Sequence, residues 1–366
     1  MKRTIGDVIA YLEQWAPLSY QEEYDNSGLM TGNPAHDVSG ILVTLDCTEE
    51  VIQEAIQSGC NIIVAHHPIL FKGLRKITGK TYDERAIILA IKHDVAIYAI
   101  HTNLDHIHTG VNKRIADRLG LIRTRVLAPR TDTLTKLTTF IPEEATDRVL
   151  NALYEAGAGS IGKYSGCSFQ TQGIGTFTPS AEANPTIGQA NTPEKVAETR
   201  TEVVFPTHRS EAVMTALRKN HPYEEVAYYL SRLVNENQEV GAGMIGELPE
   251  PEEPISFLRR LKEVMNTTCI RYTSIVKPMI NVVAVCGGAG KFLLKNAIAQ
   301  KADVFVSSDF KYHDFFEAEN KITVADIGHF ESEQFTKDLL VEVLSKKFPN
   351  FAVNFSKTVT NPISYL

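Results

Sequence analysis

Near the beginning of the chain, two short apolar segments flank an amphipathic segment, and this order constrains the fold more than any other feature. Residues 41–45 and 61–65 are rich in isoleucine, leucine and valine and are predicted to be buried strands. Residues 49–58 are predicted to form a helix that begins after Thr48 and ends at Gly59. A strand, a helix and a strand in this order predict a right-handed crossover between parallel strands. We therefore expect an α/β fold.

Two adjacent histidines, His66 and His67, follow the second of these strands, and Pro68 comes next. In open α/β sheets, ligands and reacting groups gather outside the carboxyl ends of the strands. The proline prevents the segment from continuing as a central strand, so two imidazoles are presented at a rigid strand end. Because imidazole is the commonest metal-ligating side chain, the pair is a candidate metal site. The alternative is a structural pair that is hydrogen-bonded to backbone carbonyls.

Polar side chains recur after later predicted strands. The strand at residues 95–100 is followed by His101 and then by Asp105. The strand that ends at Asp326 is followed by His329 and Glu333, which are four residues apart near the start of a helix and can share one face. The alternative for this last pair is an ordinary helix start with acidic residues, which the helix dipole favours.

Together, these strand ends are expected to bring three imidazoles and two carboxylates to one region of a sheet. With one carboxylate bridging, such a set can hold two divalent ions about 3.5–4 Å apart. A mixture of imidazole and carboxylate ligands suits zinc, iron, manganese, cobalt or nickel. The sequence therefore predicts a dinuclear centre at His66, His67, Asp105, His329 and Glu333.

Two further histidines are candidates for proton transfer at this centre. His101 directly follows a predicted strand, and His313 comes after a strand end that closes with Asp309. Each of them can instead support a metal ligand by a hydrogen bond, or be a histidine of the core. We predict that both are catalytic acid/base groups.

A glycine-rich turn at Gly287–Gly290 and a basic segment at residues 72–76 are candidates for binding a phosphate. The turn does not match a phosphate-binding loop, because Val285 and Phe292 stand where that motif requires glycine and serine or threonine. It can still receive an anion at a helix start, or serve only to pack a strand tightly against a helix. For the basic segment, the alternative is a solvated loop.

The pattern changes between about residues 125 and 240. The expected order of elements there is strand, helix and strand, twice, with a loop rich in glycine, serine and threonine from 157 to about 190. This order suggests a small ferredoxin-like sandwich. We therefore predict a metal-binding α/β core in two parts, 1–124 and 241–366, interrupted by an inserted binding or interaction domain at 125–240.

Composition limits the partners and the compartment. The chain of 366 residues carries a formal net charge of −7, which argues against an extensive nucleic-acid-binding face. No apolar run approaches the ~20 residues needed to cross a bilayer, and no signal peptide is recognised. The five cysteines are widely spaced and form no C-x-x-C pair, which favours the reducing cytoplasm.

Five stretches of the sequence resemble the NIF-three-like family, whose members are often named GTP cyclohydrolase 1 type 2 homologues. The stretches extend over nearly the whole chain: Asp25–Leu29, Ala65–Ile69, His101–Asp105, Gly328–Glu333 and Thr360–Pro362. The segments Gly159–Tyr164 and His221–Glu225 resemble the extra domain of the longer bacterial members, which is similar to PII and CutA modules.

The resemblance implies a three-layer α/β core with mostly parallel sheets, interrupted by a PII/CutA-like domain of ferredoxin-like fold. It implies two divalent metal ions per subunit, held by the five ligand residues named above, with Glu333 bridging. It also implies a ring-shaped homohexamer in which the metal sites face an inner cavity.

Two functions are compatible with these features. The first is a metal-dependent hydrolase that acts on a nucleotide-like substrate such as GTP, with His101 or His313 transferring a proton. The alternative is a non-enzymatic metal-binding or regulatory protein whose inserted domain senses a ligand or a partner.

Overall fold

The structure, a computed structural model, describes residues 3–366. The chain folds into two compact units. The first combines the chain up to Pro129 with Gln238–Leu366, and the second comprises Arg130–Asn237. We expected boundaries after residues 124 and 240. All the residues predicted to form the metal centre lie in the first unit.

One sheet of the first unit is built mainly from the N-terminal part of the chain. All of its neighbouring strands are parallel except β1 and β4. The strands β2 and β3 are therefore parallel, as the strand–helix–strand order predicted. In spatial order, the strands are β1 (Gly28–Thr31), β4 (Ala96–Ala99), β3 (Ile62–Ala65), β2 (Ile41–Thr44) and β15 (Val353–Phe355).

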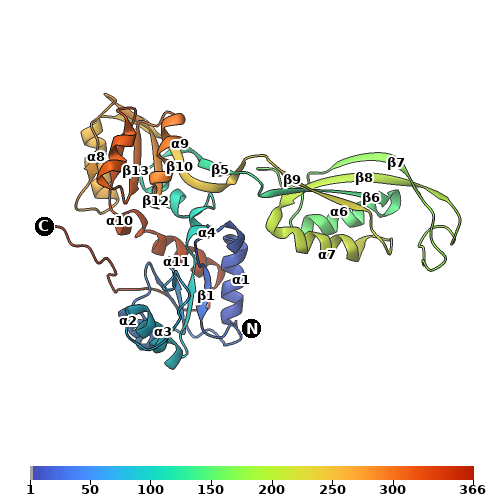
Figure 1. The fold of residues 1–366 in the computed structure, drawn as a ribbon, viewed down its shortest axis with the longest axis horizontal. Coiled ribbons are helices and arrows are strands. Elements are labelled where there is room, and N and C mark those ends of the chain that lie inside the picture. The colour runs from blue at the N-terminus through green and yellow to red at the C-terminus, as the bar shows by residue number, and fades with distance from the viewer. Residues whose placement is uncertain (1–2) are drawn as a thin grey trace. The chain divides into compact units, whose positions relative to one another are not determined.

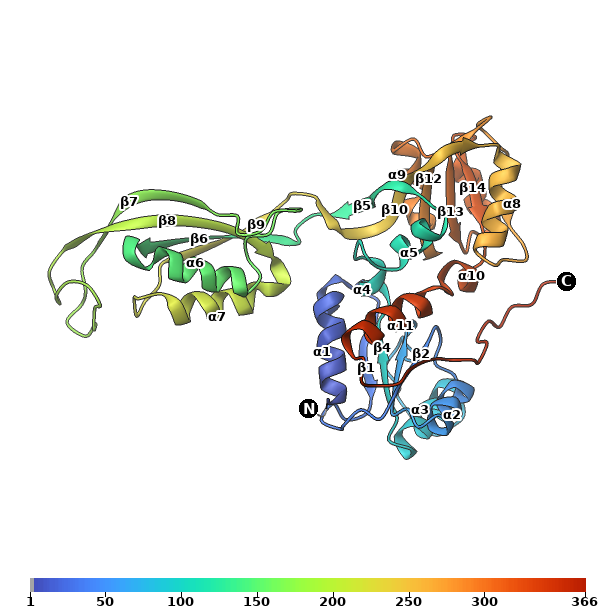
Figure 2. The same cartoon turned by 180° about the vertical axis from the view of Figure 1, so that it is seen from behind.

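Side chains of this sheet alternate between two helix layers. In β3, Ile62 and Val64 belong to the core on one face, and Ile63 and Ala65 belong to a separate core on the other face. Two helices cover each face, as Figures 1 and 2 show. The first pair is α1 (Ile5–Trp15) and α11 (Thr336–Lys347), and the second is α2 (Glu49–Gln57) and α3 (Tyr82–Lys92).

The second sheet of this unit comes mainly from the C-terminal half. The strands β12, β13 and β14 are parallel, and β10 and β11 run antiparallel to their neighbours β12 and β14. We did not expect β5 and β10, whose charged residues and prolines interrupt the apolar pattern. In spatial order, the strands are β11 (Arg271–Tyr272), β14 (Thr323–Asp326), β13 (Val304–Ser308), β12 (Ile280–Ala289), β10 (Asn237–Glu252) and β5 (Ile122–Arg130).

Helices between the two sheets join them into one core. This core includes Val64 of the first sheet, Leu340 of α11 and Val285 of the second sheet. The helices α5 (Val111–Arg118) and α8 (Pro254–Val264) pack into it as well, and α9 (Leu294–Ala299) covers the other face of the second sheet. Helices thus cover both faces of each sheet, and the predicted mixed α/β class is confirmed.

Short helices follow the strands at the predicted site. The helix α4 (Thr102–Asp105) comes after β4, and α10 (His329–Glu333) comes after β14. His329 and Glu333 are therefore the first and last residues of one short helix. The remaining short helical turns are η1 (Leu18–Tyr20), η2 (Glu143–Ala145), η3 (Thr207–Arg209), η4 (Lys291–Leu293) and η5 (Tyr312–Ala318).

The second unit is an antiparallel sheet with two helices on one face. Its strands, in spatial order, are β7 (Phe169–Phe177), β8 (Glu194–Pro206), β6 (Leu134–Pro142) and β9 (Tyr228–Leu233). The helices α6 (Thr146–Glu155) and α7 (Ser210–Asn220) pack on it around Val149, Phe205 and Leu217. Along the chain the order is strand, helix, strand, strand, helix, strand.

The strand β7 corrects the expectation of a loop from 157 to about 190. Most of its side chains are exposed, and it contains Gly173 and Gly175, so it lacks the alternating apolar pattern of a half-buried strand. Nine residues of β7 nevertheless pair with β8. The segments on either side of β7, residues 157–168 and 178–193, are loops as expected.

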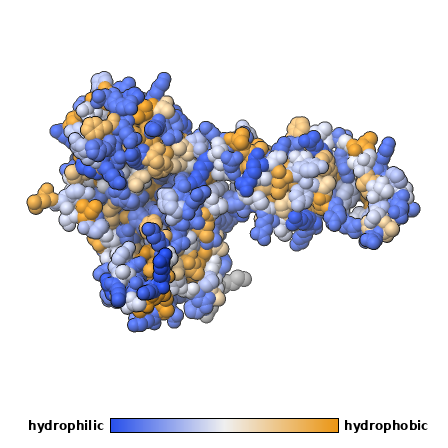
Figure 3. Space-filling model, in the orientation of Figure 1, coloured by the Kyte–Doolittle hydropathy of each residue, from blue (hydrophilic) through white to orange (hydrophobic). Residues whose placement is uncertain are grey.

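Apolar and polar side chains are mixed on the visible face of both units (Figure 3). In the second unit, the exposed apolar side chains include Phe169, Ile174 and Tyr229. Within residues 3–366, none of the helices combines the length and the apolar character needed to span a bilayer.

Candidate metal centre

His66 is fixed by the sheet that precedes it. The strand pairing continues past β3, since the backbone N–H groups of His66 and His67 donate to Thr44 and Leu45. The Nδ1 atom of His66 lies 2.8 Å from the carbonyl oxygen of Ile100. A carbonyl oxygen only accepts hydrogen bonds, so Nδ1 carries the proton and Nε2 presents its lone pair when the ring is neutral. His66 is completely buried.

Three other histidines are held in the same way, but by carboxylates. The Nδ1 atoms of His67, His101 and His329 each lie 2.7 Å from a carboxylate oxygen. The three carboxylates belong to Asp46, Asp25 and Asp309, respectively. Hydrogen bonds of this kind orient a metal-ligating imidazole and increase its basicity. All four rings thus have Nε2 available for a ligand.

His66, Asp105 and Glu333 form the first group of potential ligands. The Nε2 atom of His66 lies 3.7 Å from Oδ1 of Asp105 and 3.8 Å from Oε1 of Glu333. His66 Nε2 and Asp105 Oδ1 are buried and have no hydrogen-bond partner. Metal–ligand bonds of about 2.0–2.2 Å place two ligands of one ion roughly 3–4 Å apart. A divalent ion here would satisfy two buried atoms that are otherwise costly to leave unpaired.

The second group shares Glu333 with the first. Oε2 of Glu333 lies 3.0 Å from Nε2 of His67 and 3.1 Å from Nε2 of His329. Glu333 is buried, at 3% exposure. One of its oxygens faces the nitrogen of His66, and the other faces the nitrogens of His67 and His329.

His101 belongs to a third group of potential ligands, with His66 and His67. Its ring centroid lies 5.3 Å from the centroid of each of these two rings. We predicted a catalytic role for His101 and did not consider it a ligand. The geometry allows both, because its Nδ1 is bound to Asp25 and its other nitrogen is free.

The electrostatics of the centre favour positive charge. Burial opposes protonation of His67 and His329, but contacts with carboxylates outweigh it and raise their pKa values to about 10 and about 11. Burial likewise opposes ionisation of Glu333, but the surrounding histidines hold its pKa well below the usual range. Burial raises the pKa of Asp105 to about 6. Metal ions can replace the protons that the two histidines carry.

The glycine-rich segment Gly287–Gly290, expected as a turn, belongs mostly to the end of β12, where it makes room for Glu333. A Cβ atom on Gly288, whose φ is +63°, would lie 2.4 Å from Oε1 of Glu333. The backbone N–H groups of Gly287 and Gly288 donate to Asn112 and Ser332, at 3.0 and 2.9 Å. These N–H groups already have partners, so this end of β12 serves close packing rather than anion binding.

A cavity of about 700 Å³ opens onto the cluster. It is within the size range of sites for small molecules. Tyr24, Phe71, Tyr82 and Phe292 line it with aromatic side chains that are more than half exposed. Its lining residues, all in the described part of the chain, include no lysine or arginine. Positive charge in this cavity therefore comes from its histidines and from any bound cation.

Two sequence-predicted features lie outside this cavity. His313 is exposed in η5, contacts the rings of Tyr312 and Phe316, and is not among the lining residues. The basic residues of segment 72–76 are exposed and do not line the cavity either.

The carboxylates that support the histidines were not assigned by sequence reasoning. A signal was present, because Asp46 and Asp309 each follow a strand end, β2 and β13. The segment near the C-terminus also contributes: the hydroxyl of Thr360 donates to Asp46 at 2.6 Å, and Asn361 donates to Glu331 at 3.1 Å. Through Thr360, the stretch Thr360–Pro362 thus supports the aspartate that orients His67.

Fold and cluster together define an α/β protein with a candidate metal centre beyond its strand ends. A sequence model of the family described as Duf34/NIF3 (NGG1p interacting factor 3) matches residues 3–362. The chain is 39% identical over 364 residues to the GTP cyclohydrolase 1 type 2 homolog of Halalkalibacterium halodurans, covering 98% of each chain. It is 38% identical over 365 residues to the homolog of that name from Bacillus subtilis, again covering 98% of each.

Solved structures agree with this comparison. A Bacillus cereus protein related to NIF3 matches with a TM-score of 0.87 and 34% identity, covering 100% of both chains. A Staphylococcus aureus protein matches with a TM-score of 0.79 and 28% identity, covering 100% of this chain and 99% of that one. The chain belongs to the Duf34/NIF3 family, and the resemblance seen in the sequence is confirmed.

Proposed function

We propose that the protein is a dinuclear metal-dependent hydrolase that acts on a nucleotide-like substrate. One observation carries the metal part of this proposal: His66 Nε2 and Asp105 Oδ1 are buried, unpaired and close to Glu333. His66, Asp105 and Glu333 would hold one divalent ion, and His67, His329 and Glu333 would hold the other. The mixed nitrogen and oxygen ligands suit zinc, iron, manganese, cobalt or nickel.

When bound, such ions would supply a water molecule that is acidic enough to act as a nucleophile near neutral pH. The protein's own contribution would be orientation and proton transfer. His101 lines the cavity, and its Nδ1 is bound to a carboxylate of Asp25 whose pKa is held low, despite burial, by His101 and Thr102. This pair can accept a proton and stabilise the imidazolium that forms. His313 has no contact with the cavity, and we assign it no step.

The substrate part of the proposal rests on the walls of the cavity and on the relatives' names. Exposed aromatic side chains such as Phe71 and Phe292 can stack on a planar base. Because the cavity offers no lysine or arginine, a phosphate group would depend on the ions for its charge complement. We therefore expect the protein to recognise the nucleobase of its substrate. Guanosine should then be turned over as well as GTP.

The test combines metal analysis with turnover in two matched variants of the full chain. Glu333→Gln removes the shared carboxylate charge, and Glu250→Gln removes an exposed carboxylate on β10. In the natural protein and in Glu250→Gln, we expect about two ions per chain and hydrolysis of the nucleobase of the substrate. Both should be lost in Glu333→Gln and after chelation. Turnover that survives chelation, or fewer than about one ion after reconstitution, would refute the proposal.

A second candidate function is a regulatory metal-binding protein, and the second unit favours it. The spatial order β7–β8–β6–β9 and the two helices support our proposal that this unit is a ferredoxin-like, PII/CutA-like module inserted at about 125–240. It contains a cavity of its own, far along the chain from the metal ligands. Two bound ions without turnover of any nucleotide or nucleoside would favour this function.

The remaining proposals concern assembly and compartment. The family resemblance supports a ring-shaped homohexamer, which light scattering on the purified protein tests directly. A cytoplasmic location is supported by the five cysteines, which are all free within the described residues.

A further inference from the structure

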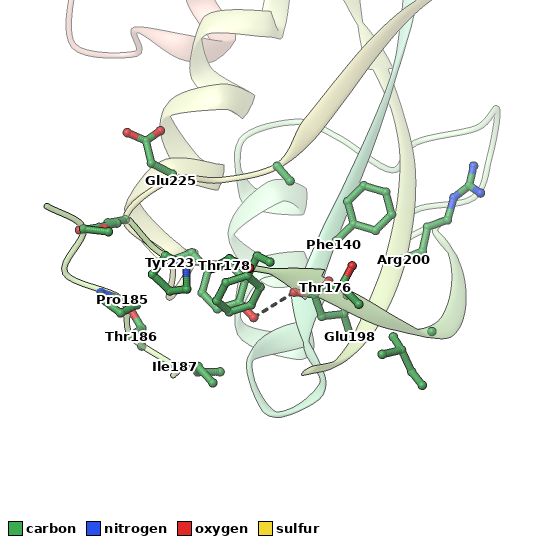
Figure 4. Close-up of a pocket in the computed structure, with 18 of the residues that line it drawn as sticks. Phe140, Thr176, Thr178, Pro185, Thr186, Ile187, Glu198, Arg200, Tyr223 and Glu225 are labelled. Atoms are coloured by element: carbon green, nitrogen blue, oxygen red, sulfur yellow. Dashed lines mark hydrogen bonds between the residues drawn. The ribbon is translucent and has the colours of Figure 1, made fainter. Parts of the chain in front are cut away.

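The second unit contains a cavity of about 600 Å³, which is large enough for a small organic molecule. Figure 4 shows it with the residues that surround it. Its walls come from β7, from β8, from the β7–β8 loop and from the segment between α7 and β9. Apolar and aromatic side chains dominate the walls, including Phe140, Ile174, Phe177, Pro185, Ile187 and Tyr223.

The β7–β8 loop is tied to the opposite wall of this cavity. The backbone N–H of Asn184 donates to Oε1 of Glu224 at 2.9 Å. The hydroxyl of Thr186 donates to the carbonyl oxygen of Pro222 at 2.7 Å. These bonds hold Pro185 and Ile187 over the cavity, so the pocket is formed before any ligand arrives. A preformed pocket lowers the entropic cost of binding.

His221 fixes the aromatic residue at the base of the cavity. One ring nitrogen, Nε2, donates to the carbonyl oxygen of Phe140 at 2.9 Å, and Nδ1 accepts from the N–H of Tyr223 at 3.2 Å. Burial lowers the pKa of His221, in keeping with a neutral ring that donates once and accepts once. The motif His221–Glu225, which the metal centre does not use, is therefore part of this pocket.

Glu198 places a carboxylate in the pocket. The hydroxyl of Tyr223 donates to its Oε1 at 2.9 Å, as Figure 4 shows. Its other oxygen, Oε2, lies where a Cβ atom on Gly175 would approach to 2.1 Å, so the glycine makes room for it. Among the described residues, no cationic side chain lies within ion-pair distance of Glu198. One carboxylate oxygen is thus free to accept a hydrogen bond from a ligand.

Arg200, the one basic residue among the described residues of the lining, is already paired. Arg200 points away from Glu198 in Figure 4, and its guanidinium lies 2.6 Å from Glu202. Glu224 and Glu225 add further negative charge to the lining. The pocket therefore combines a negative electrostatic character with aromatic walls, and both attract cations.

We propose that this pocket binds a small organic cation, an amine or guanidinium compound with an apolar or aromatic body. Its N–H groups donate to Oε2 of Glu198, and its charge lies near the faces of Phe140, Phe177 and Tyr223. The apolar body occupies the space under Pro185 and Ile187. This inference does not depend on the proposed function of the metal centre, which belongs to the other unit.

The test uses three probes of one shape and different charge on the full chain. Tryptamine is a cation at neutral pH, indole-3-ethanol is neutral, and indole-3-acetate is an anion. Ligand-observed NMR titration measures the affinity of each. We expect tryptamine to bind at least about tenfold more tightly than the neutral probe, and the anion to bind weakest. Equal affinities, a preference for the anion, or no binding of any probe would each overturn the proposal.

Three variants locate the binding. Glu198→Gln should weaken tryptamine binding by about tenfold or more, whereas Glu211→Gln, which removes an exposed carboxylate of α7 outside the cavity lining, should change it less than about threefold. Gly175→Ala provides a second route, because its methyl group displaces Glu198 without removing the charge. Gly175→Ala should lower the affinity for tryptamine, and this result does not depend on whether Glu198→Gln folds. Unchanged affinity in Gly175→Ala, or in a folded Glu198→Gln, would place the cation elsewhere.

Discussion

At the scale of single residues, the candidate metal centre is organised by what binds the far nitrogen of each imidazole. A backbone carbonyl oxygen, that of Ile100, accepts from His66. Carboxylate oxygens of three aspartates hold the imidazoles of His67, His101 and His329. These contacts fix tautomer and ring orientation while no ion is bound. The ligands therefore lose little conformational freedom when an ion arrives, which favours tight binding.

This arrangement predicts that Asp46 matters for metal binding, although it is not a candidate ligand. The substitution Asp46→Asn keeps the shape of the side chain but removes the charge that orients His67. We expect the metal affinity to fall about 10- to 100-fold. A competition titration with a chromogenic chelator measures it. Asp94→Asn, at an exposed position outside the cavity, is the control and should leave the affinity unchanged.

At the scale of elements, the centre depends on short helices and turns that begin where strands end. The helices α4 and α10 carry Asp105 and Glu333, and the glycine-containing end of β12 packs against Glu333. Glycine at 288 is required both by its positive φ and by the closeness of Glu333.

The substitution Gly288→Ala tests this packing. An alanine there would adopt a left-handed conformation, at a cost of roughly 1–2 kcal/mol, and would press on Oε1 of Glu333. We expect a lower melting temperature and, in the protein that remains folded, fewer bound ions. Calorimetry and elemental analysis measure the two effects. Gly73→Ala, where a Cβ atom meets nothing within 4 Å, should change neither; an equally neutral Gly288→Ala would show that Glu333 can move freely.

At the scale of the whole molecule, the two candidate sites belong to different compact units. All potential metal ligands lie in the unit formed by the two ends of the chain, and the organic-cation pocket lies in Arg130–Asn237. The chain leaves the first unit along β5 and returns along β10, which are neighbours in one sheet. Neighbouring strands are about 4.8 Å apart, so a short turn can join them.

We therefore predict that the second unit can be removed without loss of the metal centre. Replacing Arg130–Asn237 with a short glycine-serine turn should leave the number of bound ions per chain unchanged, because every ligand and supporting aspartate remains. Elemental analysis and circular dichroism check this outcome. A folded but metal-free truncated chain would mean that the second unit supports the centre.

The sequence by itself determined the class of fold and the positions of the potential ligands. Strand periodicity and the order of elements are local properties, and a side chain that follows a parallel strand must lie beyond the carboxyl edge of its sheet. His66, His67, Asp105, His329 and Glu333 could be named on these grounds. The strands β5, β7 and β10 were missed because their exposed, charged or glycine-containing segments carry no alternating apolar pattern.

Only the tertiary structure decided which residues meet. The approach of Glu333 to the histidines after β3 depends on how two sheets pack on shared helices, and no local pattern encodes that distance. The same packing draws His101 into the group of potential ligands and leaves His313 on the surface. The sequence specifies what each strand end presents, whereas long-range packing determines which of these groups share a site.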